Sequence, residues 1–263
     1  MDLDYTVMDP TGNITVLVTS PVPEKEQPRV GAALLAAEAD AEQVGFVRVG
    51  DVPGSEAELR MAGGEFCGNA AMSAAALHCL HWALPTATVR VRVSGAAEPV
   101  TVAAEKLPGG GYACAVDMPR PLAVEEATLT LEGLAYRLPL VRFKGISHLV
   151  LPGDFDRGLA ERAARQWCAE LGAEALGLML LDEAAGTMAP LVWVPVGESL
   201  YWERSCASGT AAVGAYLARR AGAKTDVSLA QPGGILRLSA EAVGPLTLRG
   251  TVRLLRVGHF SPE

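Results

Sequence analysis

Residues 63–72 read GGEFCGNAAM, which places Cys67 after a glycine turn and directly before an alanine-rich run that predicts a helix. The same order returns in residues 203–218, ERSCASGTAAVGAYLA, where Cys206 precedes a second run of helix-forming residues. A repeated unit of this kind indicates two similar domains related by pseudo-symmetry. We therefore predict one domain around each of the two helices that follow Cys67 and Cys206.

Alternating apolar and polar runs on both sides of the first helix predict strands. The first predicted strand is NITVLVTS (13–20), a helix follows at 28–40, and VGFVRVG (44–50) is the next strand. After the Cys67 helix, which Pro85 ends, three alternating runs separated by turn residues predict a meander. These runs span 87–95, 99–107 and 111–118.

The second half repeats this order of elements. Residues 138–145 and 188–196 predict strands, and residues 156–172 predict an amphipathic helix between them. The Cys206 helix comes next, and strand pairs are predicted in 225–240 and 246–258. Pro119 and Pro121 mark a domain boundary. We expect domains at 1–120 and 121–263, with the last strand free to pack back on the first domain.

Composition restricts the class of protein. Half of the residues are hydrophobic and the net charge is −8, which favours a compact globular chain and disfavours nucleic acid as a partner. The N-terminal MDLDYTVMD lacks the pattern of a signal peptide, and no apolar run is long enough to span a bilayer. With an odd number of cysteines, five, we expect a cytoplasmic protein without membrane contact.

A thiol at a helix entrance suits proton transfer. A helix N-terminus stabilises an anion by about 0.3 to 2 kcal/mol, too little alone to ionise a thiol fully at neutral pH, so a neighbouring group is also expected. The candidates for this supporting role are Glu65, His148 and Glu203. The unpaired amides that begin each helix could hold a substrate carboxylate.

Two such thiols match the requirements of racemisation. One thiolate removes an α-proton, the amides stabilise the charge that develops on the carboxylate, and the other thiol returns a proton to the opposite face. This chemistry needs neither a metal nor pyridoxal phosphate, so we predict no metal site and no cofactor. The predicted partner is a small-molecule substrate, an amino acid, which Asn69 and the amides of Gly68, Ser208 and Gly209 would hold.

The chain resembles the diaminopimelate epimerase and pyridoxal-independent amino-acid racemase superfamily along nearly its whole length. CGNA at 67–70 and CASGT at 206–210 are similar to its two active-site cysteine motifs. TGNI around Asn13 and GISHLV around His148 are similar to an N-terminal substrate-contacting segment and to a histidine segment near the active site. QPGGILRL (231–238) is similar to its closing strands.

The resemblance implies an α/β (α+β) fold of two pseudo-symmetric domains, each a barrel-like, mainly antiparallel sheet around a central helix, with substrate enclosed between them. It also implies that Cys67 and Cys206 are the acid and base, and that Asn13 contacts the substrate. Oxidation of the two thiols to a disulfide would then stop catalysis.

The identity of the substrate rests on departures from the epimerase pattern. Ile146 and Ser147 stand where diaminopimelate epimerases have Asn-Pro, and Glu203 lies closer to the second cysteine than their glutamate does. GGEFCGNA with SCASGT is closer to the histidine racemases that supply D-histidine for opine-type metallophores. Diaminopimelate epimerase and a non-catalytic amino-acid-binding or redox-responsive protein stay as alternatives. The sequence leaves open whether the protein forms a homodimer.

Overall fold

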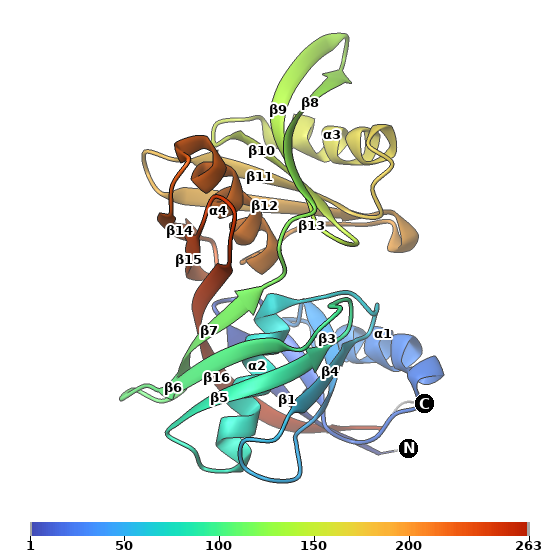
Figure 1. The fold of residues 1–263 in the computed structure, drawn as a ribbon. Helices are drawn as coiled ribbons and strands as arrows, with labels where there is room; N and C mark the ends of the chain where they lie inside the picture. Colours follow the sequence, from blue (N-terminus) through green and yellow to red (C-terminus); the bar gives the residue numbers. More distant parts are fainter. Residues whose placement is uncertain (1, 262–263) are drawn as a thin grey trace. The chain divides into compact units, whose positions relative to one another are not determined.

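A computed structural model describes residues 2–261 (Figure 1). The chain divides into two compact units. The first comprises Met1–Asp117 together with Arg249–Glu263, and the second comprises Met118–Leu248. The last segment of the chain therefore belongs to the same unit as the first.

The first unit is a closed barrel of eight strands in the order β1-β2-β3-β4-β5-β6-β7-β16, and β16 pairs with β1 to complete the ring. A closed barrel leaves no unpaired sheet edge. The strands are β1 (Leu3–Pro10), β2 (Thr15–Val18), β3 (Gln43–Arg48), β4 (Ala57–Met61), β5 (Thr86–Val93), β6 (Val100–Lys106), β7 (Tyr112–Met118) and β16 (Leu246–Phe260).

Helix α2 (Gly68–His81) occupies the interior of this barrel. It packs against β1, β2, β4, β5 and β6, and every residue from Gly68 to Cys79 is buried. Because most of these residues are alanines or similarly small, the helix fits among the inward side chains of the strands. The shorter α1 (Gln27–Ala37), preceded by the 3-10 turn η1 (Glu24–Glu26), packs on β3 through Val30 and Leu34.

The second unit is built on a mixed sheet in the order β15-β14-β12-β11-β10-β9-β8, with β13 added to β12. The strands are β8 (Ala123–Leu131), β9 (Leu134–Arg142), β10 (Ser147–Pro152), β11 (Leu176–Asp182), β12 (Thr187–Val194), β13 (Ser199–Trp202), β14 (Thr225–Gln231) and β15 (Gly234–Ala240). A 3-10 turn, η2 (Pro195–Gly197), joins β12 to β13.

Two helices pack against this sheet, and alternation along β10 separates their contacts. Leu149 and Leu151 join the cluster around Trp167 of α3 (Arg157–Glu170). Val150, between them, joins the cluster that contains Val213 of α4 (Ala207–Ala221). The sheet therefore presents one face to α3 and the opposite face to α4, the helix that begins at Cys206.

The structure confirms the predicted fold class and both cysteine helices, but six of its strands were not predicted: β1, β4, β8, β10, β11 and β13. Strand β1 was not predicted, although Leu3, Tyr5 and Val7 alternate with polar residues and are buried. Strand β8 was not predicted because it follows the proline-rich segment directly. Segment 246–258, predicted as a strand pair, is one strand, because no turn interrupts its alternation.

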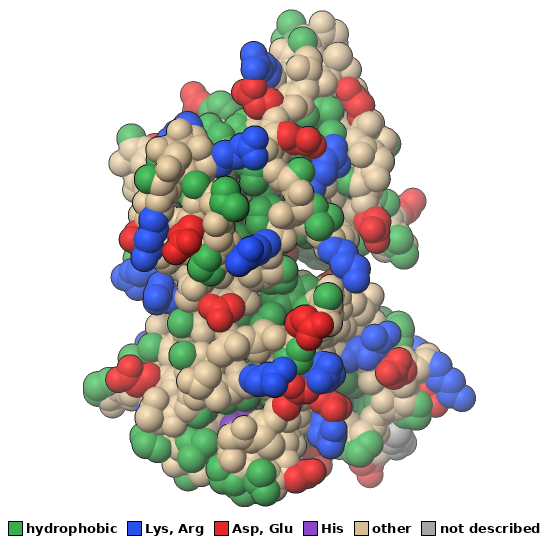
Figure 2. All heavy atoms as spheres, viewed as in Figure 1, with side chains coloured by type: hydrophobic (Ala, Val, Ile, Leu, Met, Phe, Trp, Pro, Cys, Tyr) green, Lys and Arg blue, Asp and Glu red, His purple; other side chains and the backbone are tan. Residues whose placement is uncertain are grey.

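Acidic and basic side chains are interspersed on the face drawn in Figure 2. Exposed ion pairs of the described residues include Arg48 with Glu58 and Arg220 with Glu183. Pairs of this kind contribute at most about 1 kcal/mol each. Within residues 2–261, no helix has both the length and the apolar character needed to cross a bilayer.

Candidate active site

Cys67 is the N-cap residue of α2. Its extended backbone (φ −134°, ψ 115°) lies outside the helix, and its sulfur accepts a hydrogen bond from the backbone N–H of Ala70 at 3.4 Å. This contact is the usual N-cap contact with sulfur in place of oxygen. The side chain is half-buried, and the positive end of the α2 dipole faces it.

Cys206 repeats this geometry at the start of α4. Its backbone is also extended (φ −120°, ψ 109°), and its sulfur accepts the N–H of Gly209 at 3.3 Å. The residue is only 4% exposed, so Cys206 is more buried than Cys67. The placement of both cysteines at helix entrances, predicted from sequence, is confirmed.

Each helix entrance presents amides close to its thiol. Gly68 and Asn69 begin α2, and Ala207 and Ser208 begin α4, and the backbone N–H groups of a first helical turn point out of the helix N-terminus. The hydroxyl of Ser208 lies 3.6 Å from the sulfur of Cys206. An anion such as a carboxylate is stabilised at these positions.

Gly209 lies in close contact with the side chains beneath the start of α4. A Cβ added there would lie 2.1 Å from the sulfur of Met179 on β11 and 3.1 Å from the sulfur of Cys206. Met179 is fully buried beneath the start of α4. The absence of a side chain at Gly209 thus lets the helix approach the sheet closely enough for its N–H to reach the thiol.

Glu203 is the charged neighbour of Cys206. Burial, followed by the charge and hydrogen bonding of the Glu203 carboxylate, raises the pKa of the Cys206 thiol well above its ordinary value. The hydroxyl of Ser208 and the N–H of Gly209 act in the opposite direction but are weaker. Burial and the neighbouring carboxylate therefore favour the protonated form of the Cys206 thiol.

Glu65 is held in the turn before Cys67. Burial raises the pKa of its carboxyl, while hydrogen bonds from the backbone of Glu65 itself and of Gly63 oppose the shift. A Cβ on Gly63 would lie 2.4 Å from the carboxylate. The carboxylate of Glu65 thus folds back on its own loop.

Asn13 joins the start of α2 to the start of β3. Its amide oxygen accepts hydrogen bonds from Asn69 Nδ2 at 3.0 Å and from Gln43 Nε2 at 2.7 Å. Its Nδ2 donates to Glu42 at 2.6 Å. The first unit therefore brings Asn13, Asn69 and Cys67 together at one end of α2.

Sequence reasoning missed Glu42, because it appeared only as the residue before a predicted strand. Strand β3 pairs parallel with β2, with Thr15 opposite Gln43, and this pairing carries Glu42 to Asn13. A parallel neighbour across an intervening helix cannot be recognised from local patterns. The only signal in the sequence for this contact would have been the polar residues on both sides of α1, with Asn13 before the helix and Glu42 after it.

His148 is fully buried on the face of β10 that Val150 shares with the α4 cluster. Neither ring nitrogen has a hydrogen-bond partner among residues 2–261, and burial lowers the pKa of the imidazole to about 3. The ring packs against Gly177, where a Cβ would lie 2.2 Å from Nδ1. Within the second unit, the Met179 side chain reaches both Gly177 and Gly209, so it lies between His148 and the start of α4.

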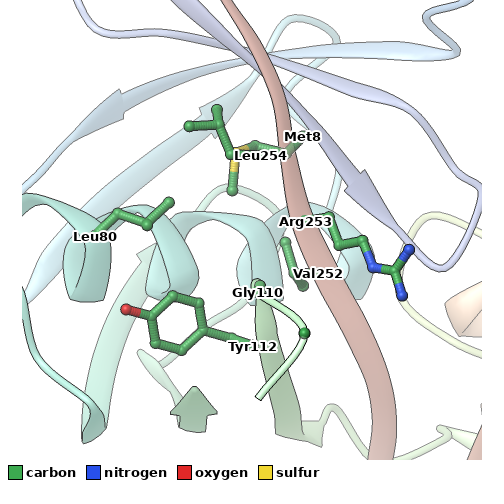
Figure 3. A pocket seen from close by; sticks show the side chains of 9 residues that line it. Met8, Leu80, Gly110, Tyr112, Val252, Arg253 and Leu254 are labelled. Carbon is green, nitrogen blue, oxygen red and sulfur yellow. The ribbon is translucent and has the colours of Figure 1, made fainter. Parts of the chain in front are cut away.

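A separate pocket of about 190 Å³ lies in the first unit (Figure 3). It is lined by Met8, Leu80, Gly109, Gly110, Gly111, Tyr112, Val252, Arg253 and Leu254. Arg253 directs its guanidinium away from Leu80 and Tyr112 in Figure 3. Leu80 is in the last turn of α2, roughly 20 Å along the helix from Cys67. This pocket is therefore remote from the thiol.

Comparison with known proteins places the chain among racemases. The sequence profile of the histidine racemase CntK N-terminal domain matches residues 2–260. A histidine racemase from Staphylococcus aureus (strain Mu50) is 30% identical over 97% of this chain and 96% of its own. One from Fusobacterium nucleatum (strain ATCC 23726) is 30% identical over 82% of this chain and 81% of its own.

Solved structures share the fold at lower identity. A Pseudomonas aeruginosa protein described as a predicted epimerase has a TM-score of 0.73 at 17% identity and covers 99% of this chain and 100% of its own. A hydroxyproline epimerase from Agrobacterium vitis was solved with trans-4-hydroxy-L-proline. It has a TM-score of 0.69 at 14% identity, and the match covers 98% of this chain and 92% of its own. Together with the full-length profile match, these findings show that the chain belongs to the histidine racemase CntK family and is an isomerase of the amino-acid racemase class.

Proposed function

We propose that this protein interconverts L- and D-histidine by a two-base mechanism in which Cys67 and Cys206 are the catalytic acid and base. The observation that carries the proposal is the repeated N-cap geometry, in which each sulfur accepts the N–H three residues further on. Relatives named histidine racemase that align along most of the chain support the choice of substrate.

The reaction is balanced in protons. One cysteine thiolate takes the α-proton of the amino acid and becomes a thiol, and the electron pair of the C–H bond passes toward the carboxylate as an enolate-like charge. The other cysteine, as a thiol, delivers its proton to the opposite face of the α-carbon and becomes a thiolate. The reverse reaction exchanges the two roles, so no external oxidant or reductant takes part.

The helix entrances supply the electrostatic stabilisation. Amides of Gly68 and Asn69 at α2, and of Ser208 and Gly209 at α4, are the donors proposed for the carboxylate whose charge grows in the transition state. Asn13 orients Asn69 through their 3.0 Å hydrogen bond. These donors are fixed before substrate arrives, so little reorganisation is needed during the reaction.

Glu203 is the proposed proton acceptor for Cys206. Cys206 must lose its proton before it can act as the base, and the carboxylate that accepts its hydrogen bond can receive that proton. Glu65 and His148 are proposed as supporting groups of the same site. His148 would act in its neutral form, because burial holds its pKa at about 3.

We also propose that the enzyme is cytoplasmic. Its product, D-histidine, would be used to build opine-type metallophores. All five cysteines are free thiols, which suits a reducing compartment. The two reactive thiols would be lost to oxidation elsewhere.

The test is α-proton exchange in deuterated water, followed by NMR, with reducing agent present. The panel contains L-histidine, D-histidine, other common amino acids and L,L-diaminopimelate. We expect exchange with inversion for histidine, abolished by Cys67→Ser and by Cys206→Ser. Cys168→Ser is the matched control, because Cys168 is a buried thiol that donates to Ala173 O within α3 and its following turn. Exchange on diaminopimelate alone would overturn the choice of substrate.

A further inference from the structure

We propose that Gln231 and Thr210 are positioning residues that fix the sulfur of Cys206 for proton transfer; the inference rests on the proposed function of Cys206. Gln231 ends β14, and Thr210 lies in the first turn of α4. Thr210 is the last residue of the CASGT motif and Gln231 lies outside it; neither is proposed to transfer a proton, and both are buried polar side chains. Their hydrogen bonds enclose the backbone of Cys206.

Three hydrogen bonds form a closed ring. The backbone N–H of Cys206 donates to Gln231 Oε1 at 2.8 Å, and Gln231 Nε2 donates to Thr210 Oγ1 at 2.9 Å. Thr210 Oγ1 then donates to the backbone oxygen of Cys206 at 2.7 Å. Gln231 thus uses its amide oxygen and nitrogen at once, and both backbone groups of Cys206 are held by side chains.

The ring matters because Cys206 is an N-cap residue. Its N–H lies outside the helical hydrogen-bonding pattern, and its extended φ and ψ are not imposed by the helix. A small rotation about either angle would move the sulfur away from the N–H of Gly209. Fixing the N–H and the carbonyl on both sides of the Cα removes this freedom.

The hairpin that follows Gln231 adds a second attachment to the same segment. Gln231 pairs with Gly234 across the β14–β15 turn, and in this turn the N–H of Gly233 donates to Arg204 O at 2.7 Å. The turn therefore contacts the cysteine loop at Arg204 as well as at Cys206. The turn is thus attached to the loop by these hydrogen bonds, although Pro232 at its tip is exposed.

The arrangement belongs to one cysteine. Thr210 is four residues after Cys206, and the residue four after Cys67 is Ala71, which has no hydroxyl. Ala71 contacts Cys67 O through its backbone N–H at 3.0 Å, as any helical residue would. Loss of Gln231 or Thr210 should therefore impair proton transfer by Cys206 and leave Cys67 unchanged.

The kinetic signature follows from the two-base scheme. The L and D forms are equally stable, so kcat/KM must fall equally in both directions and cannot identify the impaired base. The substrate deuterium isotope effect can. Misplacing Cys206 slows removal of the α-proton from the enantiomer that Cys206 attacks, so the isotope effect on kcat/KM rises for that enantiomer only.

The experiment uses paired substitutions in the full chain. Gln231→Met removes both hydrogen bonds at similar size, and Gln231→Glu keeps the acceptor for the Cys206 N–H. Thr210→Val removes the hydroxyl at constant shape, and Thr210→Ser keeps it. Gln166→Met is the matched control, because it removes a glutamine hydrogen bond, to Thr130 O, on the exposed side of α3.

We expect Gln231→Met and Thr210→Val to lower kcat for histidine roughly 10- to 100-fold, as misplaced catalytic groups do. The α-deuterium isotope effect should rise for a single enantiomer. This should be the enantiomer whose α-proton Cys206 removes, which is the one whose α-proton removal Cys206→Ala abolishes. Thr210→Ser and Gln166→Met should stay within about twofold of the parent enzyme, and Gln231→Glu should retain more activity than Gln231→Met. Equal rises for both enantiomers, or a Thr210→Val enzyme as active as Thr210→Ser, would overturn the proposal.

A substrate-free readout separates this inference from the proposed function. Iodoacetamide labelling of the free protein reports the reactivity of each thiol. It is measured site by site with mass spectrometry across pH 6 to 10. Gln231→Met and Thr210→Val should change the Cys206 profile at least threefold and leave Cys67 within twofold. Unchanged Cys206 labelling would reject the positioning role even if histidine proves not to be the substrate. Where Gln231→Met fails to fold, the comparison of Thr210→Val with Thr210→Ser decides.

Discussion

Asn69, two residues after the first cysteine, donates from Nδ2 to Asn13 Oδ1 at 3.0 Å across 56 positions of sequence. The same Asn13 donates to Glu42 at 2.6 Å, so the start of α2 is linked to a carboxylate at the start of β3. Both asparagines are buried. The link fixes the side-chain amide of Asn69 in the first turn of the helix, where the substrate carboxylate is proposed to bind.

Disrupting this link should weaken substrate binding. Asn13→Ala removes the acceptor of Asn69 and the donor to Glu42, and we expect KM for histidine to rise at least about tenfold, comparable to losing one or two hydrogen bonds to a charged group. Asn13→Asp, which places a carboxylate beside Glu42, should raise KM further. Initial rates by circular dichroism give KM and kcat. An unchanged KM in both variants would show that Asn13 has no part in binding.

Glu203→Gln should separate thiol reactivity from catalysis. Removing the negative charge lowers the raised pKa of Cys206, so more thiolate forms and iodoacetamide should label Cys206 several-fold faster at pH 8. Racemisation should nevertheless slow by about 10²-fold or more, because during turnover the proton of Cys206 must then leave to solvent instead of passing to Glu203. Glu174→Gln, an exposed carboxylate in the same unit, is the control. Faster labelling together with full activity would contradict the role of Glu203 as acceptor.

His148 should make the protein less stable in mild acid. Burial lowers its pKa from 6.5 to about 3, so between these values the unfolded chain binds a proton that the folded protein does not. Stability therefore falls as pH drops below about 6.5. His148→Leu removes this dependence. Between pH 7 and pH 5, its free energy of unfolding should therefore fall by about 2 kcal/mol less than that of the parent protein. Urea unfolding at the two pH values measures the difference, and parallel losses would contradict the burial of a neutral ring.

Gly209→Ala should impair both packing and catalysis. The new Cβ would lie 2.1 Å from the sulfur of Met179 and 3.1 Å from that of Cys206, so the Met179 side chain or the start of α4 must shift. We expect a loss of about 1 to 3 kcal/mol in unfolding free energy, together with lower kcat. Met179→Ala in the same chain makes room and should recover part of both. Failure of the double variant to recover either would place the cost elsewhere.

The sequence predicted those parts of the site that depend on local pattern. A cysteine between a glycine turn and an alanine-rich run is recognisable without a structure, as is the helix that each begins. The Gln231 contact with Cys206 and the Glu42 contact with Asn13 were not recognisable, because both depend on which strands become neighbours. Strand β1 was missed for a related reason, since its short alternating pattern gains meaning only from pairing with β16 at the other end of the chain.

The measurement to make first is racemisation of L- and D-histidine by Cys67→Ala and Cys206→Ala, followed by circular dichroism, with thermal unfolding to confirm that each variant is folded. Two-base catalysis predicts that each single substitution lowers racemisation in both directions by at least about 10³-fold, because inversion needs a proton donor and an acceptor on opposite faces. A folded single variant that racemises histidine at the parent rate in either direction would contradict it.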